Sequence, residues 1–381
     1  MKLTNPFLKS ISKIIPGVMI SLIFMCCANK AQNKIPANSK ASKETVQLYN
    51  LLYEIPEKGI MFGHQDDLAY GVKWKYQEGE SDIKRVVNDY PAIFGWDLGN
   101  IELDAEVNLD SVPFDKMRQF IIHSYNMGGI NTISWHLNNP ATGGNAWDTN
   151  PVHAVKSILP KGANHEIYKF WLDIVAQFLK SLKTEDGIMV PVIFRPFHEF
   201  SGSWFWWGSD LCTKDEFVQL WQFTFNYLTK TKDVNNILFC FSSSGDFKDG
   251  AEYLTRFPGK EFVDIIGFDT YQFPGLSNTD FITHLQSKLK ILADVAKELN
   301  IPYALTETGF EQIPDTFWWT EVLWKGIEQS GISYVHLWRN ACEKDKPNHF
   351  YVPYNGQLSE KDFIAFENLD RTLFLSDLQQ N

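Results

Sequence analysis

Eight short apolar segments alternate along the chain with amphipathic segments, and this alternation constrains the fold more than any other feature. The apolar segments are rich in β-branched and aromatic residues and are bounded by Gly, Pro or Asn, as buried β-strands are. They cover residues 59–65, 91–99, 128–138, 188–199, 235–244, 263–272, 302–310 and 333–340. Between them, apolar side chains recur at helical spacing over residues 112–127, 165–182, 213–230 and 281–299.

A (β/α)8 barrel contains eight strands that alternate with helices, and this chain shows that number of strand segments. The pattern extends from about Thr45 to Leu373, and a barrel of about 250 residues leaves room for long loops. Two such loops, residues 66–80 and 138–165, follow strand ends. A doubly wound open sheet is the alternative, but no G-x-G-x-x-G phosphate loop follows any of the strands. We therefore expect an α/β fold, a (β/α)8 TIM barrel that forms a single catalytic domain.

The N-terminus has the pattern of an export signal. Basic residues up to Lys13 precede the apolar run IIPGVMISLIFM, which is followed by Cys26 and Cys27. Either cysteine resembles a bacterial lipoprotein processing site, and a plain signal peptide or an uncleaved anchor are the alternatives. We expect a signal over residues 1–27, a polar tether over 28–43 and the barrel over 44–381. The protein would be secreted across the inner membrane and would be periplasmic or an outer-membrane lipoprotein.

Composition limits the substrate. The net charge of −11 argues against nucleic acid and against anionic membrane surfaces, since both select basic patches. The chain contains 13 Trp, 14 Tyr and 29 Phe, more than a core needs, so some of these rings should line a groove. We expect a neutral substrate, no nucleic-acid partner, no protein partner and a monomer.

Polar and aromatic residues gather at the carboxyl end of each predicted strand. Segment 188–199 ends in Arg195, His198 and Glu199, and Trp204 follows shortly after. The other strand-end residues are His64, Asp66, Asp67, Trp96, Asp97, Trp135, His136, Asn138, Asp269, Tyr271, Glu307, Trp338 and Arg339. In a barrel, all of them converge on the rim that carries the active site.

Two of these residues, Glu199 and Glu307, form a candidate catalytic pair. They end the fourth and seventh predicted strands, and a retaining glycosidase uses two carboxyl groups about 5–5.5 Å apart, one as proton donor and one as nucleophile. Arg195 can form a bidentate hydrogen bond with a carboxylate and keep it ionised. An ionised Glu307 would raise the pKa of Glu199, which could then begin the reaction protonated. Salt-bridged rim residues are the alternative for both.

Five segments carry a resemblance to a known family: SWHLNNP, RPFHEFSGSWFWWG, GFDTYQ, TETGF and LWRN. In their order and at these strand ends, they resemble the β-mannanases of glycoside hydrolase family 26, in clan A. The resemblance covers essentially the whole chain after the signal and tether. It implies an enzyme that cleaves β-1,4-mannosidic bonds in mannan, galactomannan or glucomannan by double displacement. A β-1,3-xylanase or a mixed-linkage β-glucanase of the same family is the alternative.

The resemblance also implies roles for individual residues. Glu199 matches the general acid/base and Glu307 the nucleophile. His198 and Tyr271 match residues that hold the nucleophile side and stabilise its ionised form. The residues matched to sugar binding are Trp338, under the sugar that is attacked, and His136 and Trp204, which line the subsites around the cut.

Several rim residues have two open interpretations. Arg339 is a candidate for the boundary of an outer subsite. Asp97 and Asp269 would either contact sugar hydroxyls or form ion pairs inside the barrel mouth. Trp206 and Trp207 would either line a subsite or pack in the core, whereas we expect packing for the residues Trp318 and Trp319.

Two other function classes compete with a glycosidase. A metal-dependent barrel hydrolase would take its ligands from His64, Asp66, His136, His198 and Asp269. Its first strand would typically show His-x-His rather than His-x-Asp, and a metal site leaves the two glutamates unexplained. A surface lipoprotein that only binds glycans would need neither glutamate. We therefore expect an enzyme with no metal and no cofactor.

Overall fold

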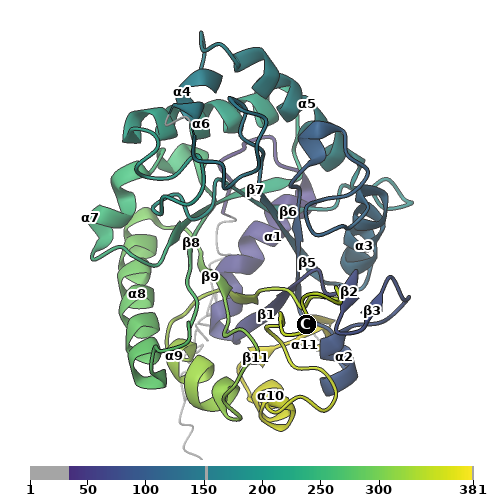
Figure 1. Ribbon diagram of the computed structural model, residues 1–381. Helices are drawn as coiled ribbons and strands as arrows, with labels where there is room; N and C mark the ends of the chain where they lie inside the picture. The colour runs from purple at the N-terminus through teal and green to yellow at the C-terminus, as the bar shows by residue number, and fades with distance from the viewer. Residues whose placement is uncertain (1–33, 151–152, 380–381) are drawn as a thin grey trace, which may run out of the picture. The chain divides into compact units, whose positions relative to one another are not determined.

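The computed structural model describes residues 34–150 and 153–379. Eight parallel strands form a closed ring, because β1 pairs with β4 on one side and with β10 on the other (Figure 1). In order around the ring they are β1 (Ile60–Gln65), β4 (Ile93–Asp97), β5 (Ile130–Trp135), β6 (Val192–Pro196), β7 (Ile237–Ser244), β8 (Ile265–Asp269), β9 (Tyr303–Thr308) and β10 (Tyr334–Leu337). The expected TIM barrel is confirmed, and each barrel strand lies within a segment predicted as a strand.

Helices surround this ring of strands (Figure 1). They are α2 (Asp82–Val87), α3 (Phe114–Asn126), α4 (Ala154–Ile158), α5 (His165–Ser181), α6 (Lys214–Asn226), α7 (Gly250–Tyr253), α8 (Asn278–Leu299), α9 (Lys325–Ile327), α10 (Glu360–Glu367) and α11 (Leu375–Gln379). The four predicted helices are present. Thr213 begins α6 with a capping box, in which its side chain and that of Glu216 satisfy each other's backbone N–H groups.

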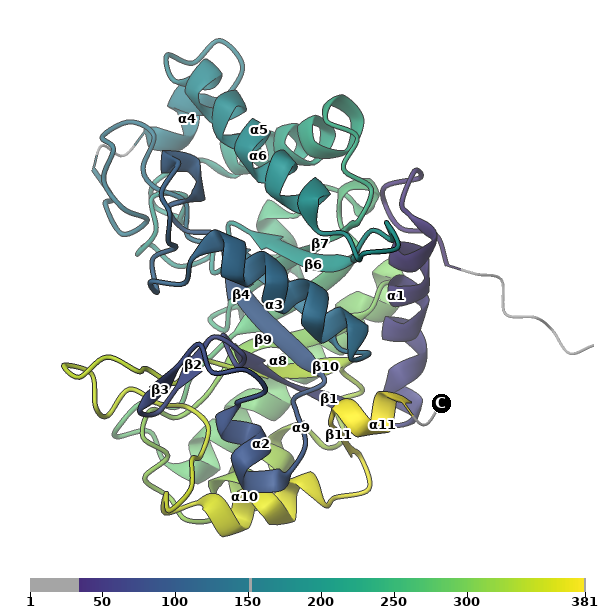
Figure 2. The same ribbon diagram turned by 90° about the vertical axis from the view of Figure 1, so that its right-hand side faces the viewer.

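The amino-terminal end of the barrel is closed by α1 (Lys43–Glu54), which is visible through the ring of strands in Figure 1. Figure 2 shows α1 against one end of the strands, with the hairpin of β2 (Tyr70–Gly71) and β3 (Trp74–Lys75) toward the other. The apolar side chains of α1 form one buried cluster with the first inward-facing residues of the strands: Leu48, Tyr49, Leu52, Met61, Ile93, Ile130, Ile193, Leu238, Ile265, Ala304 and Tyr334. An apolar floor therefore separates the active-site end from the base.

Polar side chains fill the middle of the barrel. Gln65 and His336 are buried there, with their Oε1 and Nε2 atoms 3.2 Å apart. A Cβ atom on Gly95 would collide with both of them. Gly95 is therefore required because side chains from β1 and β10 cross the space next to it, and the barrel is a packed core rather than a pore.

Residues 34–42 correct the predicted tether. The backbone N–H of Ala37 donates to Asp264 at 2.7 Å, and the side-chain amide of Asn38 donates to the carbonyl of Val234 at 3.2 Å. The side chain of Ser42 caps α1 by accepting from the backbone N–H of Thr45. This half of the polar segment is thus packed against the barrel, because its amides satisfy buried oxygens at the barrel base. The predicted signal, Cys26 and Cys27 lie outside the described residues.

No helix in the described ranges combines the length and the apolar character that crossing a bilayer requires. The two predicted long loops contain short elements: the β2–β3 hairpin lies in residues 66–80, and α4 lies in residues 138–165.

Candidate active site

A strained turn after β6 presents Glu199 at the mouth of the barrel. Phe197 and Glu199 both adopt left-handed backbone conformations, with φ of 53° and 54°, which are unfavourable for residues with side chains. The turn is held by the buried ring of Phe197 and by a 2.9 Å hydrogen bond from the backbone N–H of Glu199 to the carbonyl of Ser242 in β7. This hydrogen bond places the backbone of Glu199 beside the carboxyl end of β7.

Glu307 is aimed into the same space by an irregularity in the sheet. Phe268 pairs with Leu305, but the next residue, Asp269, pairs with Glu307, so that Thr306 is an extra residue in β9. A bulge of this kind changes the face on which the following side chain emerges. Glu307 is therefore brought opposite Asp269 at the carboxyl ends of β8 and β9.

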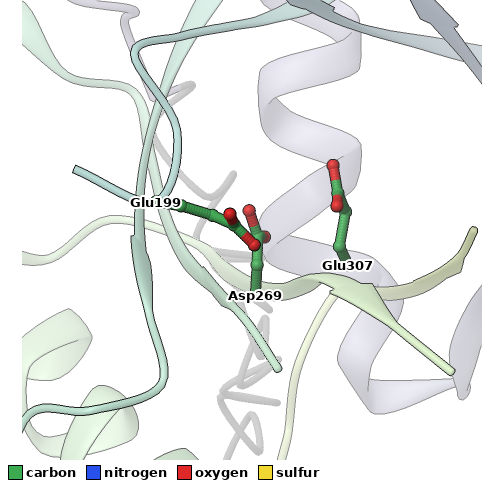
Figure 3. A group of neighbouring side chains, drawn as sticks. All are labelled: Glu199, Asp269 and Glu307. Atoms are coloured by element: carbon green, nitrogen blue, oxygen red, sulfur yellow. The ribbon is translucent and has the colours of Figure 1, made fainter. Parts of the chain in front are cut away.

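Three carboxylates meet at this point. One oxygen each of Glu199, Asp269 and Glu307 lies within 4.8 Å of the others. Figure 3 shows Glu199 and Asp269 side by side, with Glu307 across from them. The approach of Glu199 to Glu307 suits the separation of about 5–5.5 Å used for direct attack on a sugar, and not the 6.5–9.5 Å that leaves room for a water molecule.

Arg195 and Tyr271 hold Glu307 as a carboxylate. Arg195 donates from Nη2 to Glu307 Oε1 and from Nη1 to Asp269 Oδ2, the latter at 2.6 Å. The hydroxyl of Tyr271 donates to Glu307 Oε2 at 2.9 Å. The predicted bidentate contact of Arg195 with one carboxylate is therefore wrong: the guanidinium bridges two, because the bulge places Asp269 and Glu307 side by side. Burial and the charge of Glu307 raise the pKa of Tyr271, so the phenol keeps the proton that it donates.

Glu199 has the opposite electrostatic environment. Burial, followed by the charges of Asp269 and Glu307, raises the pKa of Glu199 to about 8. The indole N–H of Trp204 donates to Glu199 Oε2 at 2.6 Å, and this hydrogen bond partly opposes the rise. The sequence predicted the influence of Glu307, but burial is the larger cause. Two neighbouring carboxyl groups are thus set up for different protonation states, the pattern of a general acid beside a nucleophile.

The two histidines form a pair. The Nε2 atoms of His136 and His198 are 3.1 Å apart, and Nδ1 of His136 lies 2.7 Å from Oδ2 of Asp97. The resemblance had implied that His198 holds the nucleophile side. In the structure its polar contact is with His136 instead, and Glu307 is held by Arg195 and Tyr271, because the turn that follows β6 directs the His198 ring toward β5.

The tryptophans divide into a rim set and a core set. Trp204 is 41% exposed, and Trp338 is partly buried with its ring 6.3 Å from that of His136. The core set comprises Trp206, Trp207, Trp318 and Trp319, all of which are buried. For Trp206 and Trp207 the structure therefore selects packing over a subsite, and for Trp318 and Trp319 the expected packing is confirmed.

One rim residue escaped the sequence analysis. Trp147 is 49% exposed, and its ring stacks on that of His136 with centroids 5.2 Å apart and planes 17° apart. It lies in the loop of residues 138–165, which was predicted to follow a strand end. The presence of a tryptophan in a loop that follows a strand end is the sequence feature from which this rim position could have been predicted.

The remaining rim charges form ion pairs. Nε of Arg339 donates to Oδ1 of Asp110 at 2.8 Å, Nη1 donates to the hydroxyl of Tyr70 at 3.2 Å, and the arginine side chain is 5% exposed. Asp97 and Asp269 pair with His136 and Arg195, which favours the ion-pair interpretation for both. The place of Arg339 at an outer subsite stays a prediction.

The residues considered for a metal site do not converge. Instead, His64 pairs with Asp67 at 2.7 Å, and Asp66 accepts from the hydroxyl of Tyr70 at 2.6 Å. In residues 34–150 and 153–379, the one set of three possible ligands within 4.8 Å is the carboxylate group described above. Arg195 already supplies a positive charge to two of its members, so this donor set fits a guanidinium partner.

Comparison with known proteins points to one family. Residues 37–346 match the family model "Glycosyl hydrolase family 26". A mannan endo-1,4-beta-mannosidase of Bifidobacterium adolescentis is 30% identical over 88% of this chain, which spans 35% of that protein's length. A protein of the same name from Bacillus subtilis is 27% identical, with 77% of this chain and 79% of the relative covered.

Solved structures give the same result. A GH26 beta-mannanase from Bacteroides ovatus superposes with a TM-score of 0.85 and 44% identity, covering 88% of this chain and 96% of that one. A modular endo-beta-1,4-mannanase from Cellulomonas fimi superposes with a TM-score of 0.80 and 32% identity, covering 90% and 78%. The fold, the paired glutamates and these matches agree, and the chain belongs to glycosyl hydrolase family 26.

Proposed function

We propose that the chain is an endo-acting β-1,4-mannanase that hydrolyses mannan, galactomannan or glucomannan with retention of anomeric configuration. The single observation that carries this proposal is the approach of Glu199 and Glu307, with oxygens within 4.8 Å of each other and in opposite electrostatic environments. The choice of β-1,4-mannan as substrate is supported by the names of the relatives, which are mannan endo-1,4-beta-mannosidases.

In the first step, Glu199 donates its proton to the glycosidic oxygen, and a carboxylate oxygen of Glu307 attacks the anomeric carbon. The C–O bond to the leaving sugar breaks, and a glycosyl ester of Glu307 forms. Arg195 and Tyr271 bind both oxygens of Glu307, which favours the ionised nucleophile before attack. The hydrogen bond from Trp204 orients Glu199 and offsets only part of the rise in its pKa, so Glu199 keeps the proton that it donates.

In the second step, Glu199 acts as a base. Formation of the ester removes the negative charge of Glu307, which is one of the causes of the high pKa of Glu199. The ionised Glu199 then takes a proton from water, whose oxygen attacks the anomeric carbon, and the ester bond breaks. Two inversions give net retention.

The rings at the rim suit a neutral sugar chain. Pyranose rings present flat C–H faces that pack on indoles. Trp204 and Trp147 are each more than two-fifths exposed, and Trp338 lies near His136 in the same mouth. Polyanionic substrates are disfavoured by the net charge of −11.

Product analysis tests this proposal. The protein is incubated with galactomannan, β-1,3-xylan and lichenan, the oligosaccharides are separated by chromatography, and the anomers of freshly released products are followed by proton NMR. We expect β-mannooligosaccharides of mixed length from galactomannan only. Release from xylan or lichenan instead would overturn the substrate, and initial α-anomers would overturn the mechanism.

We also propose that the protein acts as a monomer after export, as a periplasmic or outer-membrane lipoprotein. The apolar run before Cys26 and Cys27 supports export. Light scattering of the purified chain tests the monomer, and radiolabelled palmitate incorporation into the wild type and a double Cys26→Ser, Cys27→Ser variant tests lipidation.

A further inference from the structure

A buried chain of polar contacts runs from β4 toward the proton donor through Asp97, His136 and His198. Asp97 Oδ2 lies 2.7 Å from His136 Nδ1, and His136 Nε2 lies 3.1 Å from His198 Nε2. All three side chains are less than one-tenth exposed. His198 directly precedes Glu199, so the chain of contacts ends beside the residue that protonates the leaving sugar.

Asp97 occupies the first position as an ionised carboxylate. Its Oδ1 accepts the backbone N–H of Gly99 at 2.6 Å, and its Oδ2 accepts the hydroxyl of Ser134 at 2.5 Å. Burial alone would raise the pKa of Asp97, but His136, Ser134 and Gly99 together lower it. An ionised carboxylate can only accept hydrogen bonds, so Nδ1 of His136 must carry a hydrogen.

Only one hydrogen can then lie between Nε2 of His136 and Nε2 of His198. When His136 is neutral, its Nε2 has only a lone pair, and Nε2–H of His198 donates to it. Nδ1 of His198 has no hydrogen-bond partner in the described part of the chain, and as a bare lone pair it leaves no buried donor unpaired. When His136 is protonated, the shared hydrogen belongs to His136, and His198 must carry its own at Nδ1.

We propose that Asp97 is a positioning residue of the hydrolytic site, which fixes the hydrogen of His136 on Nδ1 and thereby sets the tautomer of His198 and the charge beside Glu199. This inference rests on the proposed glycosidase function. Asp97 lies behind His136 and acts on the reaction only through that ring. A similar arrangement, in which a buried carboxylate orients a histidine, fixes the tautomer in other hydrolytic sites.

Other charges also act on this chain of contacts. Burial lowers the pKa of His136, but Asp97 and then Glu307 and Asp110 outweigh it and raise the value. Burial and the charges of His136 and Arg195 hold the pKa of His198 well below its usual range. The groups that act on Glu199 are Asp269, Glu307, Trp204 and His136. Of the three carboxylates that raise the pKa of His136, Asp97 is the one within hydrogen-bond distance of its ring, at 2.7 Å.

The test compares Asp97→Asn with wild type across pH. Loss of the charge lowers the protonated fraction of His136, and its positive charge is one of the causes that lower the pKa of Glu199. We therefore expect the alkaline limb of kcat on mannooligosaccharide to move to higher pH. At the optimum, kcat should fall about 10- to 100-fold, as for other residues that orient a functional histidine, with a much smaller change in KM.

Asp264→Asn is the matched control. Asp264 is also fully buried and ionisable, but it accepts backbone N–H groups of Ala37 and Phe239 at the barrel base. This variant should lose thermal stability while its pH profile keeps the wild-type shape. Asp97→Glu, which retains the charge, should recover part of the lost kcat and the original alkaline limb.

Nitrogen-15 spectra of histidine-labelled wild type give a readout that does not depend on a variant folding. We expect Nδ1 of His136 to carry a hydrogen throughout the active pH range. The hydrogen of neutral His198 should lie on Nδ1 while His136 is charged and on Nε2 once His136 is neutral. An unprotonated Nδ1 on His136, or an Asp97→Asn enzyme with wild-type kcat and alkaline limb, would overturn the inference. If wild type itself releases no sugar from mannan, the proposed function fails instead.

Discussion

Asp269 of β8 pairs with Glu307 of β9, whereas the residue before it, Phe268, pairs with Leu305, so the pairing shifts by one residue in β9. This shift lets a single guanidinium, that of Arg195, reach both carboxylates. Asp269 therefore competes with Glu307 for the positive charge and also acts on Glu199, whose pKa it raises more than Glu307 does. The arrangement gives the two glutamates different electrostatic environments although their oxygens lie within 4.8 Å of each other.

Glu307→Gln should abolish turnover and preserve binding. The amide keeps the shape of the side chain and can still contact Tyr271, but it cannot attack the anomeric carbon. We expect kcat on galactomannan to fall roughly 10⁴- to 10⁶-fold, the range for loss of a nucleophile. Titration calorimetry with mannooligosaccharide should give a Kd within a few-fold of the wild-type KM. Residual turnover above one-hundredth of wild type would contradict the role.

Glu199→Ala should be selective for substrates that need an acid. On galactomannan, kcat should fall about 10²- to 10⁴-fold, the usual contribution of general acid catalysis. Aryl mannosides with good leaving groups depart without protonation, so the first step should recover on them, and the slow second step should then accumulate the ester. Mass spectrometry of the intact protein detects that adduct. A folded variant that is equally slow on both substrates would argue against an acid role.

The barrel could be predicted from the sequence because its signal is repeated eight times. Each strand is short, apolar and bounded by turn residues, and their carboxyl ends share one rim whatever the details of packing. Glu199 and Glu307 could be assigned to that rim for the same reason. The tether was misjudged over residues 34–42, because a polar segment does not reveal which buried oxygens its amides will satisfy.

The partners of individual side chains could not be predicted. The bulge at Thr306, which sets the contacts of Arg195, has no mark in the sequence TET. The left-handed turn at Phe197 and Glu199 depends on aromatic packing around Phe197, which also takes up Trp207. Exposed Trp204 and buried Trp206 are two residues apart, so composition alone could not separate rim from core.

Stability should depend on pH through Glu199. Its pKa is raised from 4.5 to about 8 in the folded protein, so between these values the folded state binds a proton that the unfolded chain has released. The free energy of unfolding therefore falls as pH rises through this window. Glu199→Gln, which cannot ionise, should match wild type near pH 4 and exceed it near pH 8 in chemical denaturation. A constant difference between the two proteins across this range would contradict the assignment.

Trp204→Phe should move the alkaline limit of activity upward. The substitution keeps an aromatic ring at the rim but removes the indole N–H that donates to Glu199 at 2.6 Å. This hydrogen bond favours the ionised carboxylate, so without it the pKa of Glu199 should rise further, and the acid should stay protonated to higher pH. The measurement is kcat against pH on a soluble mannooligosaccharide, with Trp147→Phe as the matched control, since Trp147 contacts His136 but makes no polar contact with Glu199. An unmoved limb in Trp204→Phe, or an equal shift in both variants, would show that the indole N–H does not tune the acid.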